Sequence, residues 1–287
     1  MRRTVFSAIL CFLSLASAIA SSPAAGEDDP NIAAQAPVIH LRQTAVLLSD
    51  GQPVVEKNYL YMLHNCQQGK LPLKPLPADV VKKLGRTFYD IWFDGRRMAV
   101  RTVYWDFKLP PPSSMKLCQF EPDKWVQISI DRPGQTLEID MRKMTATRQP
   151  SDGVVRAPLR APTAEDEKEK AEAMAQLKKM GYGSIVESQQ SQSSVAGQPC
   201  LREVSQIAGT SCTWSGGKQW GFNTDSNFDP APGSVDEPLG VPDDSVLLEL
   251  DSGKDGVRLT TQSMTVGGKA DEGAFAVPSG LTMKDLN

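Results

Sequence analysis

The chain has few of the residues on which most catalytic sites and nucleic-acid-binding surfaces depend. Only two histidines occur among 287 residues, His40 and His64, which leaves little material for histidine-based metal or acid–base sites. Basic residues show no excess, because 31 Lys and Arg stand against 34 Asp and Glu and give a net charge of −3. A protein that binds nucleic acid or an anionic membrane mainly through charge needs the opposite sign, so the composition argues against both partners.

Motifs of common enzyme chemistry are also missing from the sequence. No GxSxG, HExxH, GxGxxG or phosphate-loop pattern occurs. Two SxxK matches exist, Ser113 with Lys116 and Ser215 with Lys218, but the first follows three prolines and the second contains two glycines. Neither can begin the helix that this motif needs in penicillin-interacting enzymes. We therefore predict that the protein is not an enzyme and has no metal site or cofactor; an enzyme of unrecognised chemistry is the alternative.

Long apolar runs are confined to the start of the sequence. Arg2 and Arg3 precede an almost wholly apolar stretch, Val5 to Leu15, and Ala18-Ile19-Ala20 supplies the small residues of a cleavage site. The run is shorter than the roughly 20 residues of a spanning helix. The pattern predicts a signal peptide over residues 1–20 and a periplasmic or secreted protein with no transmembrane span. A membrane anchor is the alternative, and residues 21–37, small, polar and proline-bearing, are expected to be disordered.

Cysteines are few and widely spaced. Removal of the signal peptide takes away Cys11 and leaves four, Cys66, Cys118, Cys200 and Cys212. An even number in an exported chain predicts two disulfides, and four cysteines allow three pairings. Locality favours Cys66 with Cys118 and Cys200 with Cys212. A zinc site or a dithiol redox centre needs closely spaced cysteines, which this chain lacks.

Period-two alternation is the strongest structural signal, and it predicts hairpins. Apolar residues alternate over 87–93 and 98–104 around the turn Asp94-Gly95, and again over 126–130 and 137–141 around residues 131–134. Further short strands are expected at 184–186, 200–204, 210–214, 246–250 and 257–259, with a long loop at 223–245. Antiparallel sheets with one buried face produce this pattern.

One helix is expected between two β-rich halves. A proline-marked linker, residues 149–163, leads to Thr163, which can cap a helix with Asp166 three residues on. Apolar residues then recur at spacings of three and four up to Gly181, which suits a helix end. We predict one β-rich domain over 38–287, in halves 38–148 and 184–287 that the linker and helix 149–183 join.

Several segments resemble bacterial envelope proteins related to the LolA-like lipoprotein-sorting carriers. They are YDIWFDGRRMAVRT followed by KWVQISIDRPGQTLEIDMRKMTA, then VAGQPC, CTW and the closing FAVPSG, and they span residues 86–287. The resemblance implies a curved antiparallel sheet that forms an incomplete β-barrel, with helices on its concave side. It also implies a cavity that holds acyl chains in some members. The second cysteine pair, the long charged helix and the 223–245 loop depart from that group.

These patterns together predict a mainly β, α+β fold whose sheet carries its apolar residues on one concave face. We expect this face to bind an amphiphile, such as a lipid or acyl chain, or a partner protein of the envelope. A structural or interaction module with a filled core and no ligand is the alternative. The side chains expected to line the binding face are Ile91, Phe93, Val126, Ile128, Leu137 and Ile139.

Overall fold

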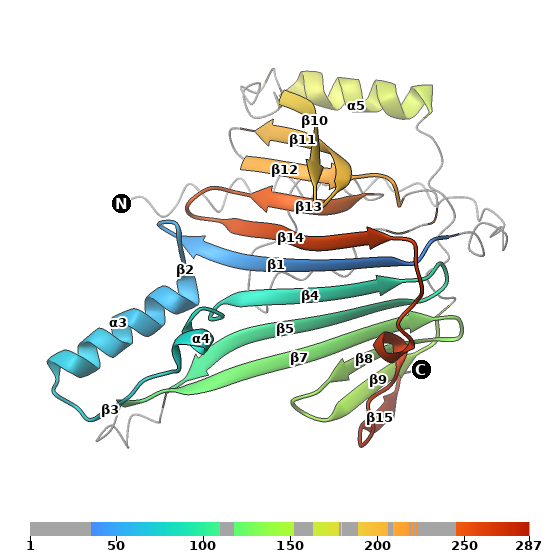
Figure 1. The fold of residues 1–287 in the computed structure, drawn as a ribbon. Coiled ribbons are helices and arrows are strands. Elements are labelled where there is room, and N and C mark those ends of the chain that lie inside the picture. Colours follow the sequence, from blue (N-terminus) through green and yellow to red (C-terminus); the bar gives the residue numbers. More distant parts are fainter. Residues whose placement is uncertain are drawn as a thin grey trace.

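The computed structural model describes residues 36–109, 118–151, 163–177, 179, 189–205, 209–217, 220, 222 and 245–286. The predicted signal peptide, the segment 21–35, the strand 184–186 and most of the loop 223–245 lie outside these ranges. The architecture is mainly β, as the sequence predicts (Figure 1). Among the described helices, none is long and apolar enough to cross a membrane.

One large open sheet contains nearly all the strands. Its order is β10-β11-β12-β13-β14-β1-β4-β5-β7-β8-β9-β15, and every neighbouring pair is antiparallel except β9 with β15, so the sheet is mixed. The strands are β10 (Gln189–Val195), β11 (Gln198–Ser205), β12 (Gly209–Trp214), β13 (Val246–Asp251), β14 (Val257–Val266), β1 (Ile39–Ser49), β4 (Arg86–Phe93), β5 (Met98–Lys108), β7 (Glu121–Arg132), β8 (Gln135–Asp140), β9 (Thr145–Gln149) and β15 (Thr282–Asp285).

Strand β1 joins the two halves of the chain into this single sheet. It pairs with β4 of the first half on one side and with β14 of the second half on the other. The C-terminal β15 then crosses back to extend the first half beyond β9. The described residues also form three short strands: β2 (Gln52–Pro53) pairs with β1, and β3 (Leu73–Lys74) pairs in parallel with β6 (Cys118–Gln119).

The predicted hairpins are present. The β7–β8 turn lies at Pro133-Gly134, as expected, because Arg132 pairs with Gln135. The β4–β5 turn lies one residue later than predicted: the amide of Asp94 donates to the carbonyl of Arg97, so Gly95 and Arg96 form the corner. The strands expected at 200–204, 210–214, 246–250 and 257–259 are confirmed as β11, β12, β13 and the start of β14.

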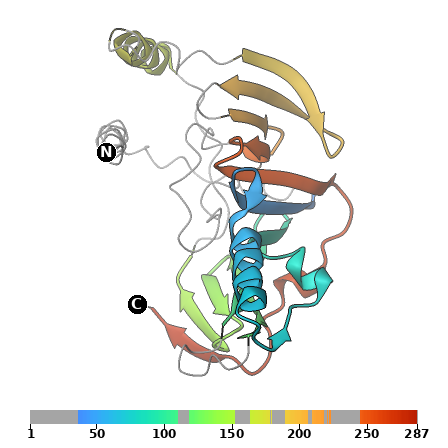
Figure 2. The same ribbon diagram turned by 90° about the vertical axis from the view of Figure 1, so that its left-hand side faces the viewer.

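Within the described ranges, four short or medium helices accompany the sheet. The predicted helix is confirmed as α5 (Ala164–Leu177), whereas α3 (Val54–Gln68), α4 (Ala78–Val81) and the 3-10 turn η6 (Glu272–Phe275) were not predicted. Helices α3 and α4 lie beside the far ends of β5 and β7, and Figure 2 shows α3 seen from that end. Tyr59 of α3 is buried there, and its hydroxyl accepts the amide of Leu76.

Both favoured disulfides are present. Cys66 of α3 is bonded to Cys118 of β6, with Cα atoms 6.1 Å apart, so the bond ties α3 to the small β3–β6 sheet, next to the start of β7. Cys200 and Cys212 join the neighbouring strands β11 and β12, with Cα atoms 5.6 Å apart. The four cysteines are therefore structural crosslinks, as the spacing predicts.

The apolar side of the sheet changes between β4 and β7. We call the side toward the viewer in Figure 1, which carries α4 and η6, the front face, and the other side the rear face. The register aligns Ile91 with Val100 and Ser129, all on the rear face, and Trp92 with Ala99 and Ile130, all on the front face. Buried side chains of β1 and β4 thus point to the rear, whereas those of β7 and β8 point to the front.

Strand β5 marks the change, because its first three residues, Met98, Ala99 and Val100, are all buried. A strand covered on both faces reads as a continuous apolar run and not as an alternation. The expected single apolar face is therefore wrong for this sheet.

Three hydrophobic cores result from this arrangement. The first lies on the rear of β1 and β4 and includes Ile39, Leu41, Ile91, Phe93, Phe222, Leu248 and Leu259. The second joins α3 and α4 to β5 through Tyr59, Val80, Leu84, Phe120, Trp105 and Phe107. The third packs η6 on the front of β5, β7, β8 and β9 through Ala99, Ile130, Leu137, Ile139, Ala146 and Phe275.

Candidate functional site

The six side chains predicted to line a binding face do not come together. Ile91 and Phe93 lie on the rear face inside the first core, at 3% and 0% exposure. Leu137 and Ile139 lie on the front face, but Phe275 covers this part of the sheet and leaves them 1% and 2% exposed. Only Val126 and Ile128, also on the front face, keep partial access to solvent.

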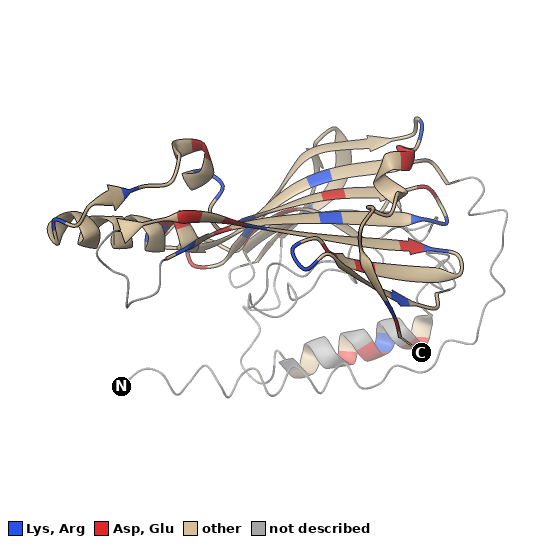
Figure 3. Cartoon of the chain, turned by 90° about the horizontal axis from the view of Figure 1, so that it is seen from below, with Lys and Arg blue, Asp and Glu red and all other residues tan. Residues whose placement is uncertain are grey.

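Those two residues belong to an uncovered part of the front face between α4 and η6. Figure 3 shows that α4 and η6 lie on the same side of the sheet, at opposite ends of the strands. The register places nine side chains in three rows across β1, β4, β5 and β7. We call this surface the front patch; its members are His40, Arg42, Phe88, Asp90, Trp92, Arg101, Val103, Val126 and Ile128.

A polar and aromatic cluster forms the β1–β4 side of the front patch. The imidazole of His40 stacks on Trp92, with ring centroids 3.7 Å apart and planes 10° apart. Its Nε2 lies 2.5 Å from Oδ1 of Asp90, and Nε of Arg42 lies 3.5 Å from the same oxygen. One carboxylate oxygen of Asp90 thus contacts both side chains, and Trp92 remains partly exposed.

An apolar row crosses the middle of the patch. Phe88, Val103 and Val126 are direct cross-strand neighbours on β4, β5 and β7. All three are only half buried, whereas the residues behind them on β1 and β4 are almost inaccessible. Contiguous apolar side chains that stay in contact with water on a folded monomer are characteristic of interaction surfaces.

Basic charge exceeds acidic charge within the patch. The middle row runs Arg42, Asp90, Arg101 and Ile128 across the four strands, so two guanidinium groups stand beside one carboxylate. Both arginines are exposed. Arg42 shares Asp90 with His40, and no ion pair of Arg101 is found within the described part of the chain. The patch therefore differs in sign from the chain as a whole, whose net charge is −3.

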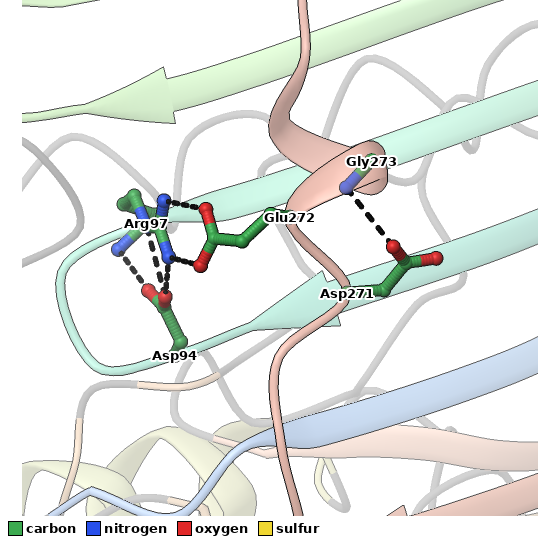
Figure 4. Close-up of polar contacts among 5 residues, drawn as sticks. All are labelled: Asp94, Arg97, Asp271, Glu272 and Gly273. Carbon is green, nitrogen blue, oxygen red and sulfur yellow. Dashed lines mark hydrogen bonds and ion pairs between the residues drawn. The ribbon is translucent and has the colours of Figure 1, made fainter.

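Ion pairs fix the two ends of the patch. At the α3 end, Arg86 reaches Glu56 over 3.2 Å, and the ammonium groups of Lys83 and Lys124 lie 5.0 and 5.4 Å from the centre of the Trp105 ring. At the other end, Arg97 binds Asp94 and Glu272 together (Figure 4). Charged side chains in contact with neighbouring elements thus bound the patch at both ends.

A second group of polar side chains lies on the rear face of β5, β7 and β8. Burial, with a smaller effect of Asp106, raises the pKa of Tyr104 to about 12. Desolvation also raises the pKa of Glu138, although this side chain still reaches solvent and accepts the Ser129 hydroxyl at 2.6 Å. Asp131 accepts hydroxyls of Thr136 and Ser151. Glu138 and Asp131 thus accept hydrogen bonds from neighbouring hydroxyl groups. Among the described residues, no cluster of His, Cys, Asp and Glu side chains could hold a metal ion.

A cavity of about 430 Å³ opens elsewhere, at the β11–β13 end of the sheet. Its lining is polar and includes Arg202, Thr210, Glu249 and Asp251. Arg202 pairs with Glu249 at 3.3 Å, and Arg258 pairs with Asp251 at 3.1 Å. The cavity therefore does not provide the apolar enclosure that a lipid chain requires, and none of the six predicted lining residues borders it.

Sequence reasoning found two members of the front patch and missed the others. Alternation directs attention to the side chains that face the core, and the patch is made mostly of residues at the intervening positions. The signal available was Asp90, Trp92 and Arg101 at intervening positions of predicted strands, but their alignment depends on the register. No known family model matches the chain, and no curated protein sequence shows significant similarity to it.

Proposed function

We propose that the protein is a non-enzymatic, exported binding module of the bacterial envelope, whose front patch docks a partner protein. The observation that carries the proposal is the pair of exposed arginines, Arg42 and Arg101, on either side of Asp90 and beside half-buried Phe88 and Val103. Protein interfaces are enriched in arginine and aromatic residues, and apolar side chains surrounded by polar groups are typical of their centres. The excess of basic charge favours a partner surface that presents carboxylates beside apolar side chains.

A protein partner fits this surface better than an amphiphile does. An acyl chain gains most when it is enclosed, as in a concave apolar pocket. Four of the six side chains on which such a pocket was predicted, Ile91, Phe93, Leu137 and Ile139, are packed against others of the same chain and are between 0% and 3% exposed. The remaining apolar row is a surface of adjacent strands that a protein can cover.

Export is supported by the crosslinks. Two disulfides between ordered elements are typical of proteins that fold in an oxidising compartment such as the periplasm or the extracellular space. The predicted signal peptide and the relationship to lipoprotein-sorting carriers belong to the same proposal.

Site-directed photo-crosslinking in envelope preparations tests the docking surface. A photoreactive amino acid at Val103 should give one crosslinked protein species, and the same group at Gln127, exposed on the rear face of β7, should not. The double variant Arg42→Glu with Arg101→Glu should abolish that species. The control Lys254→Glu with Lys284→Glu, at exposed positions outside the patch, should retain it.

Two outcomes overturn the proposal. Equal crosslinking from Val103 and Gln127 would show that the patch has no preferred partner. A stoichiometric lipid in native mass spectra of the purified protein, lost in the Arg42 and Arg101 double variant, would show that the patch serves an amphiphile instead.

A further inference from the structure

The two edges of the large sheet differ in how they are protected. At one edge, β15 has four residues, pairs in parallel with β9 and carries Lys284 and Asp285. Asp285 accepts from Nε of Arg148 at 2.7 Å. Short edge strands and charged side chains are the usual means by which proteins prevent further strands from adding. This edge is therefore closed to strand addition.

The opposite edge, β10, has none of these features. Its sequence is QQSQSSV, seven residues with no charge and no proline, and β10 lies at the end of the sheet in both views (Figures 1 and 2). Five of the seven residues are exposed, and within the described part of the chain β11 is the one strand that pairs with β10. Among the residues that the structure describes, this edge of seven residues lacks the protection found at β15.

The hairpin determines which backbone groups this edge offers. Val195 pairs with Gln198 across the turn Ala196-Gly197, whose φ values of 50° and 80° are those of a type I′ turn. In an antiparallel ladder, the pair that closes such a turn exchanges both hydrogen bonds, and every second pair does the same. The N–H and C=O groups of Ser194, Gln192 and Gln190 therefore point away from β11.

The position of Pro199 agrees with this assignment of inward-pointing and outward-pointing backbone groups. Pro199 lies opposite Ser194, at a position where its backbone nitrogen faces away from β10. The residue of β12 that would pair with it lies beyond Trp214, the end of that strand. A proline here removes no ladder hydrogen bond.

We propose that two copies of this chain associate through β10, antiparallel and about a twofold axis at Gln192, to form one continuous sheet. In this register Gln192 faces the partner's Gln192, and Gln190 faces the partner's Ser194. These are the residues whose backbone groups point outward, so each facing pair exchanges two hydrogen bonds. Ser191 then faces the partner's Ser193, because the central Ser-Gln-Ser is symmetric about residue 192.

Charge and symmetry favour a second copy over a foreign strand. A strand that pairs with its own copy brings identical side chains near the axis, and like charges directly opposite each other are destabilising. β10 contains no charged residue, so self-pairing has no such cost. A twofold interface uses the same patch on both copies and closes on itself. The charged β15 edge prevents the dimer from growing into a fibre.

Charge substitutions at the axis test this proposal on the full chain with both disulfides formed. Sedimentation equilibrium of the unmodified protein should show a monomer–dimer equilibrium. Gln192→Lys places two ammonium groups opposite each other and should raise the dimer dissociation constant at least about tenfold. Gln192→Glu should do the same. An equimolar mixture of the two variants should restore dimers, because a lysine then faces a glutamate.

The mixing experiment has a matched control and clear contrary results. Gln127→Lys makes the same change at an exposed position on the inner strand β7 and should leave the dissociation constant unchanged. A monomeric unmodified protein at all concentrations overturns the proposal. So does a dimer that Gln192→Lys leaves intact, or a mixture of the two variants that remains monomeric.

Discussion

At the scale of single residues, Arg97 connects the C-terminal segment to the sheet. It follows the β4–β5 corner, and its guanidinium donates to both carboxylate oxygens of Glu272 at 2.8 and 2.9 Å and also to Asp94 (Figure 4). The same group lies 4.3 Å from the centre of the Phe275 ring. The hydrogen bonds to Arg97 lower the pKa of Glu272. One planar cation thus joins a turn, a 3-10 helix and a core residue.

Arg97→Lys should loosen the C-terminal segment, because an ammonium group cannot bind two carboxylates in the planar, two-pronged way of a guanidinium. Hydrogen–deuterium exchange should rise several-fold over residues 270–286 and stay unchanged in β1 and β14.

Because the folded-state pKa of Glu272 is lowered, the stability from its pair with Arg97 is present above the ordinary glutamate pKa and is lost as the pH falls through the lowered value. Glu272→Gln should remove that acid-dependent part, and an unchanged acid dependence would contradict this account.

The contribution of Glu138 to stability should depend on pH in the opposite direction to that of Glu272. Desolvation raises the pKa of Glu138 in the folded state, so the folded protein binds this proton more tightly than the unfolded chain does. The resulting stability is complete below the ordinary glutamate pKa and is lost as the pH rises through the raised value. Glu138→Gln should therefore raise Tm at pH 7 and leave it unchanged near pH 3. Its amide oxygen can still accept the Ser129 hydroxyl.

Thermal unfolding at both pH values measures this effect. The same substitution at Glu165, exposed on α5, should change Tm at neither pH and serves as the control. A lower Tm of Glu138→Gln at pH 7 would show that the charged carboxylate stabilises this face of the sheet.

At the scale of elements, the two disulfides should differ in their contribution to stability. Cys66 and Cys118 are 52 residues apart in sequence, and Cys200 and Cys212 are 12 apart. In the chain-entropy account, loops of these lengths correspond to about 4 and about 3 kcal/mol, respectively. Replacing the first pair by serine should thus lower the free energy of unfolding more than replacing the second, as measured by urea denaturation. The reverse order would show that β11–β12 pairing depends on its crosslink more than on backbone hydrogen bonds.

The sequence predicts a strand or helix best where that element buries one side of its residues. Hairpins β4–β5 and β7–β8 bury one side of each strand, so period-two alternation identifies them. Strand β10 buries almost nothing and forms through backbone pairing across the Ala196-Gly197 turn, so its side chains carry no alternation. Helix α3 does carry a helical period, because Val55, Tyr59, Met62 and Cys66 recur at spacings of three and four and face the second core, but it begins with two valines, which favour strands, and the period went unrecognised. Register is likewise invisible to alternation, which is why six predicted lining residues were assigned to one face.

At the scale of the whole molecule, the change of apolar side at β5 means that no single core spans the sheet. The first core ties together both halves of the chain through β1, β4, β13 and β14. The third core involves the ends of β5, β7, β8 and β9 and the C-terminal segment on the front face. The front patch lies between the second and third cores, and only its members Trp92 and Ile128 pack against the edge of the third. An uncovered surface of this kind is therefore a consequence of the split core.

Because the core is split, two buried phenylalanines should differ in how far the loss of hydrogen-exchange protection spreads when each is truncated to alanine. Phe93 is 0% and Phe275 is 4% exposed, and each Phe→Ala change should remove about 3–5 kcal/mol of local packing. Phe93→Ala weakens the core that joins both halves, so hydrogen exchange should increase across β1, β4, β13 and β14 together. Phe275→Ala should increase exchange in β8, β9 and residues 270–286 while β13 and β14 keep their protection, because the core that holds Phe275 contains no described residue of β13 or β14. Equal loss of protection in β13 and β14 from both variants would mean that the sheet unfolds as one unit despite its two apolar sides.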